Sequence, residues 1–132
     1  MVRLTDYVTS GGCACKIGPH ILKRVLKSVT SVTNERVLAD MTGADDAGVY
    51  KISDTLALVQ TLDFFTPIVN DPVLFGKIAA ANALSDVYAM GGTPLTAMNI
   101  VGFPVSLVEQ GVLTDVLNGA AAIVAESGAV IV

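Results

Sequence analysis

The sequence predicts an α/β fold built as one unit, because extended and helical patterns alternate along its 132 residues. This length suffices for one domain with a hydrophobic core and is too short for two ordinary domains. Apolar residues make up 52% of the chain, yet no apolar run approaches the roughly 20 residues of a membrane span. We therefore expect no membrane partner and a large buried interface.

Residues 1–36 are predicted to form a mobile Gly/Cys/Lys arm followed by a short helix. In the stretch "SGGCACKIGP", the adjacent Gly11 and Gly12 favour a mobile loop. Pro19 suits the first turn of a helix that we expect to end near Val29. One face of that helix is apolar and contains Ile21, Leu22, Val25, Leu26 and Val29.

Residues 37–132 are predicted to form the α/β body. It begins with the extended segments "RVLAD", "AGVYKI" and "TLALVQTLDFF", the last two joined as a hairpin at Ser53 and Asp54. A helix over 73–90 follows, and its nearly apolar sequence predicts burial on almost all sides. Its ends are marked by a capping aspartate, a first-turn proline and two terminating glycines, namely Asp71, Pro72, Gly91 and Gly92.

The rest of the body is expected to extend the same sheet. A strand is predicted over 93–103, and Ser106 with Glu109 forms the capping box of a helix that runs to about Ser127. The last residues begin a further strand. The expected order is thus strand, strand, helix, strand, helix, strand, with helices over one sheet.

The net charge of −4 conceals an uneven distribution. Residues 1–36 carry six positive side chains against two negative ones, whereas residues 37–132 carry two positive against ten negative. A solvated basic helix is the plain interpretation, and a phosphate-binding arm is the alternative. Nucleic acid is not an expected partner, because the total is acidic and no aromatic residues interleave the basic ones. The start "MVRLTDYV" lacks a secretory signal, so we expect a cytoplasmic chain with reduced cysteines.

The two cysteines, Cys13 and Cys15, allow three interpretations. A soft metal would need further ligands, and His20 is the only histidine; as a first-turn residue it also suits the helix surface. A nucleophilic or chalcogen-handling thiol fits better, since the glycines permit close approach and Lys16 would stabilise a thiolate. Two inert thiols in a loop remain the third interpretation.

Acidic residues supply a candidate cation site. Asn82 and Asp86 lie one turn apart on the predicted helix 73–90, and a carboxylate there must find a partner or a proton. A capping or backbone hydrogen bond is the alternative for Asp86. Asp46 precedes a strand and Asp63 ends one, which suits a hard cation such as Mg²⁺, although "DD" at Asp45 and Asp46 is also a common turn sequence.

The motifs "LTDY", "GGCACKI", "DDAGVY", "TLDFFTPIVNDP", "FGKIAAANALSDVYAMGGTP" and "VGFP" resemble those of the selenophosphate synthetase (selenide, water dikinase) family, in order and along nearly the whole chain. The resemblance implies an aminoimidazole ribonucleotide synthetase-like N-terminal domain, with a mixed β-sheet covered by helices. It also implies a homodimer in which two sheets join in a barrel, and a second domain that this chain lacks.

The activity that the resemblance implies is ATP-dependent conversion of selenide to selenophosphate, with AMP and phosphate as the other products. By matching position, Cys13 would be catalytic, together with Lys16. Magnesium bridging the ATP phosphates would be held by Asp46, Asp63 and Asp86. The nucleotide would be bound by Lys16, Asp46, Asp63 and Asn82.

Two alternatives to this activity stay open. One is another ATP-using member of the same superfamily that acts on a different substrate. The other is a non-catalytic module that binds a metal or a partner through Cys13 and Cys15.

Overall fold

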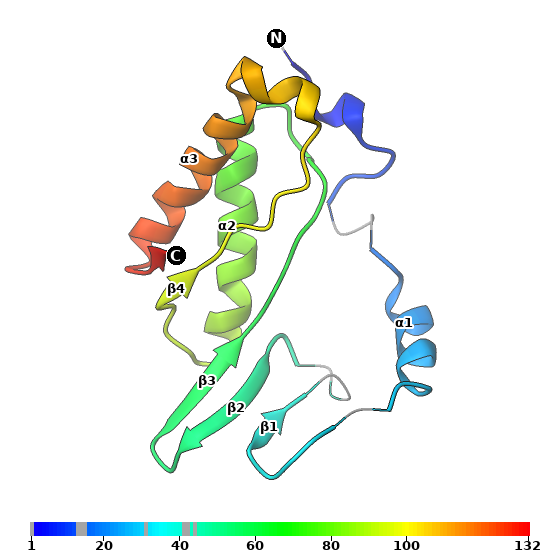
Figure 1. Cartoon of the computed structure of the whole chain (residues 1–132), viewed down its shortest axis with the longest axis vertical. Helices are drawn as coiled ribbons and strands as arrows, with labels where there is room; N and C mark the ends of the chain where they lie inside the picture. Colours follow the sequence, from blue (N-terminus) through cyan, green and yellow to red (C-terminus); the bar gives the residue numbers. More distant parts are fainter. Residues whose placement is uncertain (1, 13–15, 31, 41–42, 44) are drawn as a thin grey trace.

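The computed structural model describes residues 2–12, 16–30, 32–40, 43 and 45–132 and has mixed α/β content, as predicted. Figure 1 shows the elements in chain order. They are the 3-10 helix η1 (Leu4–Tyr7), α1 (Pro19–Leu26), β1 (Val37–Ala39), β2 (Gly48–Ser53), β3 (Leu56–Gln60), α2 (Pro72–Ala89), β4 (Thr96–Ala97), the 3-10 helix η3 (Val105–Gln110), α3 (Val112–Glu126) and β5 (Val130–Ile131). In these described ranges, no helix has both the length and the apolar character needed to cross a bilayer.

The strands form two sheets, so the predicted single sheet is wrong. β1, β2 and β3 pair antiparallel, and β2 and β3 form the hairpin predicted at Ser53 and Asp54. β4 and β5 pair parallel in a separate two-stranded sheet. The predicted third strand ends early because Gln60 already pairs with Gly48, the first residue of β2, and residues 61–65 have no β2 residue left to pair with.

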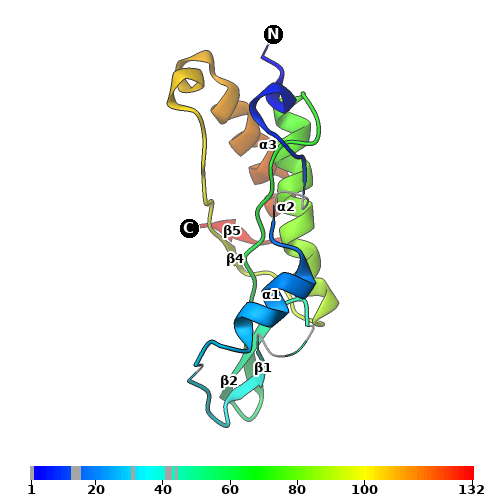
Figure 2. The ribbon, with the colours of Figure 1, turned by 90° about the vertical axis from the view of Figure 1, so that its right-hand side faces the viewer.

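Helices α2 and α3 lie side by side and carry much of the buried apolar surface (Figures 1 and 2). Their backbones approach closely at two glycines. A Cβ atom on Gly76 would lie 1.9 Å from the carbonyl oxygen of Val116, and one on Gly119 would lie 2.1 Å from that of Val73. Only a residue without a side chain fits at either position, so these two glycines set the distance between the helices.

The ends of α2 confirm the local prediction. Asp71 caps the helix by accepting a hydrogen bond from the backbone N–H of Leu74 at 2.8 Å, and Pro72 occupies its first turn. Gly91 adopts a φ of 70° just after the C-terminal end, the left-handed conformation that glycine tolerates best. The predicted burial of α2 on almost all sides is wrong, because Leu74 and Tyr88 are exposed.

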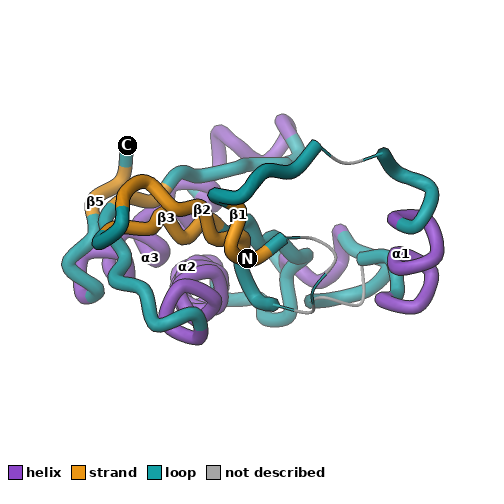
Figure 3. The backbone as a smooth tube through the Cα atoms, turned by 90° about the horizontal axis from the view of Figure 1, so that it is seen from below, coloured by secondary structure: helices purple, strands orange, loops and turns teal. Residues whose placement is uncertain are grey.

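Two other helix predictions need correction. Ser106 and Glu109 lie in η3 and form no capping box; α3 begins after Gly111, whose φ of 75° breaks the helical run, and it has no side-chain cap. Helix α1 ends at Leu26 rather than near Val29, and its apolar face is exposed. Seen from below, α1 lies away from α2 and α3, so neither helix covers that face (Figure 3).

We predict that Gly76→Ala destabilises the chain. Alanine favours a helix interior over glycine by about 1 kcal/mol, but overpacking against a neighbouring backbone costs about 1–3 kcal/mol. Because a carbonyl oxygen of α3 cannot rotate away as a side chain can, we expect a net loss of about 1 kcal/mol or more in thermal or urea unfolding. Gly102→Ala is the control, since a Cβ there meets nothing within 4 Å. Equal stability of the two variants would contradict this close contact.

Candidate functional site

The candidate site lies where the chain leaves β3 and runs towards α2, a connection that we call the 61–70 segment. It passes between the N-terminal arm, described at residues 2–12 and 16–18, and helix α2. Side chains from all three parts meet there, and the contacts centre on Asp63.

Asp63 joins the arm to α2. Its Oδ1 accepts from the Lys16 ammonium in an ion pair, and its Oδ2 accepts from the side-chain amide of Asn82. The Asp63 side chain is 14% exposed and that of Lys16 is 32% exposed, so water screens their attraction less than it would on an open surface. The Lys16 ammonium also lies 5.5 Å from the centre of the Phe64 ring, within cation–π range.

Asp86 binds the same connection one helical turn further along α2. Its Oδ2 accepts a hydrogen bond from the hydroxyl of Thr61 at 2.7 Å, and its side chain is half-buried. Asn82 and Asp86 therefore do share one face of α2, and that face lies against the 61–70 segment, as their spacing predicts. The Asp86 carboxylate thus has a hydrogen-bond partner on another segment, the Thr61 hydroxyl. This partner explains how a carboxylate is tolerated on α2 better than a capping or backbone hydrogen bond does.

The predicted metal ligands do not form one cluster in the part of the chain that the structure describes. Asp46 is exposed in the turn before β2, as is Asp45. Among the described residues, no group of three or more histidine, cysteine, aspartate or glutamate side chains is close enough to hold a metal ion. Cys13 and Cys15 lie outside the described residues.

Sequence reasoning missed three residues of the 61–70 segment that bind other parts of the chain, Thr61, Thr66 and Asn70. Asn70 Oδ1 accepts from both the backbone N–H and the hydroxyl of Thr5, at 3.1 and 2.8 Å, and Thr66 binds the arm through Ser10 and Gly12. One signal was present for Thr61. In "TLDF" it alternates with apolar residues in step with Asp63, which places both side chains on one side of an extended chain.

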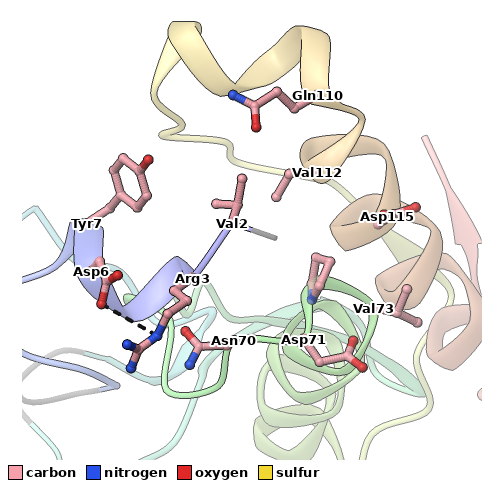
Figure 4. A pocket seen from close by; sticks show the side chains of 11 residues that line it. Val2, Arg3, Asp6, Tyr7, Asn70, Asp71, Val73, Gln110, Val112 and Asp115 are labelled. Carbon is pink, nitrogen blue, oxygen red and sulfur yellow. Dashed lines mark ion pairs between the residues drawn. The ribbon is translucent and has the colours of Figure 1, made fainter.

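A pocket of about 1140 Å³ lies elsewhere, between η1 and the first turns of α2 and α3 (Figure 4). Arg3 and Asp6 line it and form an ion pair across 3.9 Å. The predicted site residues that the structure describes do not line it; they are Lys16, Asp46, Asp63, Asn82 and Asp86. The predicted site is therefore an open junction between segments, distinct from this pocket.

We predict energetic coupling between Lys16 and Asp63. A double-mutant cycle of Lys16→Met and Asp63→Asn should give about 1 kcal/mol in urea unfolding, because both groups are partly withdrawn from water. The exposed pair Lys51 and Asp54, at 2.6 Å, is the matched control and should give less than about 0.5 kcal/mol. A coupling for Lys16 and Asp63 no larger than that of the control would show that this contact does not hold the arm.

Comparison with known proteins supports the predicted resemblance. A "Selenide, water dikinase" of Clostridioides difficile (strain 630) is 55% identical over 131 residues, which cover 98% of this chain and 37% of that protein. A protein of the same name from Pelobacter propionicus and a "Selenide, water dikinase 2" from Peptoclostridium acidaminophilum are each 52% identical, over 99% of this chain and 38% of their own lengths. The chain thus spans less than two fifths of these curated relatives, and the resemblance to their family is confirmed over that span.

The family model "AIR synthase related protein, N-terminal domain" matches residues 44–132. This range includes β2, β3, α2 and α3, and with them Asp63, Asn82 and Asp86. Since the match covers well over half of the sequence, the chain belongs to the AIR synthase related family, as an N-terminal domain.

Proposed function

We propose that this chain is the arm-bearing, nucleotide-binding domain of an enzyme that converts ATP, selenide and water to selenophosphate, AMP and phosphate. The observation that carries the proposal is the contact of Lys16 with Asp63 and, through it, with Asn82. It brings a positive charge of the arm to the acidic body, and phosphoryl transfer needs positive charge beside the phosphate oxygens. Similarity to proteins named "Selenide, water dikinase" supports the substrate assignment.

Lys16 supplies the positive charge at this junction. Phosphoryl transfer depends mainly on positioning and on stabilising the negative charge of the phosphate oxygens. A lysine ammonium is a compact cation that suits this task, and the ion pair with Asp63 keeps it at the junction. In the proposal, Lys16 binds phosphate oxygens, and Asp46, Asp63 and Asn82 contribute to the nucleotide site.

The donor chemistry of the junction fits magnesium. Mg²⁺ prefers oxygen ligands and is commonly held by one or two carboxylates together with substrate phosphates, so a closed protein cluster is not required. Asp63 and Asp86 lie on adjoining parts of the junction, linked through Thr61 two residues before Asp63. We propose that these two, joined by Asp46, hold the ion, which when bound neutralises phosphate charge.

Cys13 is the proposed catalytic thiol. Gly12, the residue before it, and Lys16, three residues after it, both form hydrogen bonds with the 61–70 segment, which supports a thiol close to the phosphate site. A thiolate is soft and polarisable and therefore suits a selenium substrate better than a hydroxyl does.

The proposal includes a cytoplasmic homodimer in which the sheets of two chains join in a barrel. Exposed apolar residues on the β2–β3 hairpin support the joining of two sheets, because a sheet face in contact with water would carry polar side chains. These residues include Ile52, Leu56 and Leu58. It also includes the division of the chain into the arm with its short helix, residues 1–36, and the body, residues 37–132.

The proposed function predicts selenide-dependent AMP formation by the full-length polypeptide that carries this chain. Cys13→Ser should abolish selenophosphate formation, measured by ³¹P NMR, while calorimetry shows ATP and magnesium binding largely unchanged, because only the thiol chemistry is removed. ADP as the nucleotide product would favour another member of the superfamily. No nucleotide turnover, with metal bound by Cys13 and Cys15, would favour a thiol or metal-binding module.

Asp86→Asn is predicted to weaken magnesium-dependent nucleotide binding without unfolding the chain. The amide keeps the shape and can still accept from Thr61, but it loses the charge that attracts a cation. Calorimetric titration with ATP should show about tenfold weaker binding with magnesium present, and Asp115→Asn, at an exposed residue of α3, is the control. Unchanged affinity in Asp86→Asn would remove this residue from the site.

A further inference from the structure

We propose that Thr66 is the positioning residue that places Lys16 of the arm beside Asp63. Thr66 forms two hydrogen bonds with the arm. Its backbone carbonyl oxygen accepts from the N–H of Gly12 at 3.0 Å, and its hydroxyl donates to the carbonyl oxygen of Ser10. In the described part of the chain, Gly12 and Thr66 form an isolated antiparallel bridge outside both sheets.

The adjacent glycines Gly11 and Gly12 of the arm lie close against the residues that follow Thr66. A Cβ on Gly11 would be 3.1 Å from the carbonyl oxygen of Pro67, and one on Gly12 would be 3.1 Å from Ile68 Cγ2. Gly12 also has a φ of 61°, which side-chain-bearing residues rarely adopt. The glycine pair thus serves a specific close contact, which lets the Thr66 bonds form.

The contacts run in antiparallel order. The chain advances from Gly12 to Lys16 on the arm while the partner positions go back from Thr66 to Asp63. A segment of four residues spans at most about 14 Å, so holding Gly12 confines Lys16 to the neighbourhood of Asp63.

A second contact, from Thr5 to Asn70, holds the arm further back. If the Thr66 bonds were lost, the free segment before Lys16 would grow from four residues to eleven, counted from Thr5. Since the probability of closing a flexible segment falls with about the 3/2 power of its length, Lys16 would meet Asp63 about fivefold less often. Thr66 therefore acts on the charge at the site through the geometry of the arm.

The effect of Thr66 on the contact between Lys16 and Asp63 can be tested without enzyme activity, whereas its role in catalysis rests on the proposed function. The test is limited trypsin digestion of the chain without nucleotide or selenide. Trypsin must take the Lys16 side chain into its own pocket, so cleavage after Lys16 follows the fraction of molecules in which the ion pair is open. Cleavage after Lys77, inside α2, reports global unfolding in the same sample.

Thr66→Val keeps the shape of the side chain and the backbone carbonyl that accepts from Gly12, and removes only the hydroxyl that donates to Ser10. Cleavage after Lys16 should therefore accelerate about twofold, less than the fivefold expected for loss of both bonds, while cleavage after Lys77 is unchanged. Thr66→Ser restores the hydroxyl and should return the rate to within about 1.5-fold of the original. Thr114→Val, at an exposed residue of α3, is the control for a generic threonine-to-valine change.

Three outcomes would overturn the inference: an unchanged rate after Lys16 in Thr66→Val, equal acceleration at Lys16 and Lys77, or failure of Thr66→Ser to rescue. None of them bears on whether the full-length polypeptide forms AMP from ATP and selenide. The inference about Thr66 and the proposed function can therefore fail separately.

Discussion

The structure around the candidate site depends on the need of the Asp63 carboxylate for partners. With 14% of its side chain exposed, the charge is largely removed from water and would be costly to leave unpaired. Asp63 receives one partner from the arm, Lys16, and one from α2, Asn82. One charged group thereby joins three parts of the chain that are distant in sequence.

The junction needs a fixed surface on one side, and α2 provides it. Gly76 and Gly119 allow the backbones of α2 and α3 to come into direct contact, so the position of α2 depends on two residues that have no side chain. Asn82 and Asp86 then present an amide and a carboxylate one turn apart towards the 61–70 segment. On the other side the arm is held to the 61–70 segment by separate hydrogen bonds and by the ion pair of Lys16 with Asp63.

The parts of the fold that follow from neighbouring residues could be predicted from the sequence. Asp71, Pro72 and Gly91 set the ends of α2 through local bonds and backbone conformation, and the hairpin at Ser53 was predicted for the same reason. The division into two sheets could not be predicted, because it depends on the pairing register of β2 and β3. In that register the first residue of β2 pairs with Gln60, so no β2 residue is left to pair with the chain after Gln60. Periodicity does not contain that information.

The candidate site was predictable in the same uneven way. The spacing of Asn82 and Asp86 placed both on one face of α2, and the charge distribution separated a basic N-terminal part of the chain from an acidic body. Thr61 alternates in step with Asp63, but it was missed together with Thr66 because a hydroxyl gives no sign in the sequence of which distant oxygen it will bind. Asp46 was a candidate from its place before a strand as well as by resemblance, and the described residues do not bring it into a cluster with Asp63 and Asp86.

These observations describe a site assembled around one acidic side chain, in which Lys16 of the arm forms an ion pair with Asp63. The most direct measurement of this arrangement is zero-length cross-linking with a carbodiimide, followed by peptide mass spectrometry. The reagent joins an amine to a carboxylate only when the two are in contact. We expect the principal cross-link of Lys16 to be with Asp63. Cross-links of Lys16 to other carboxylates, with none to Asp63, would contradict the account.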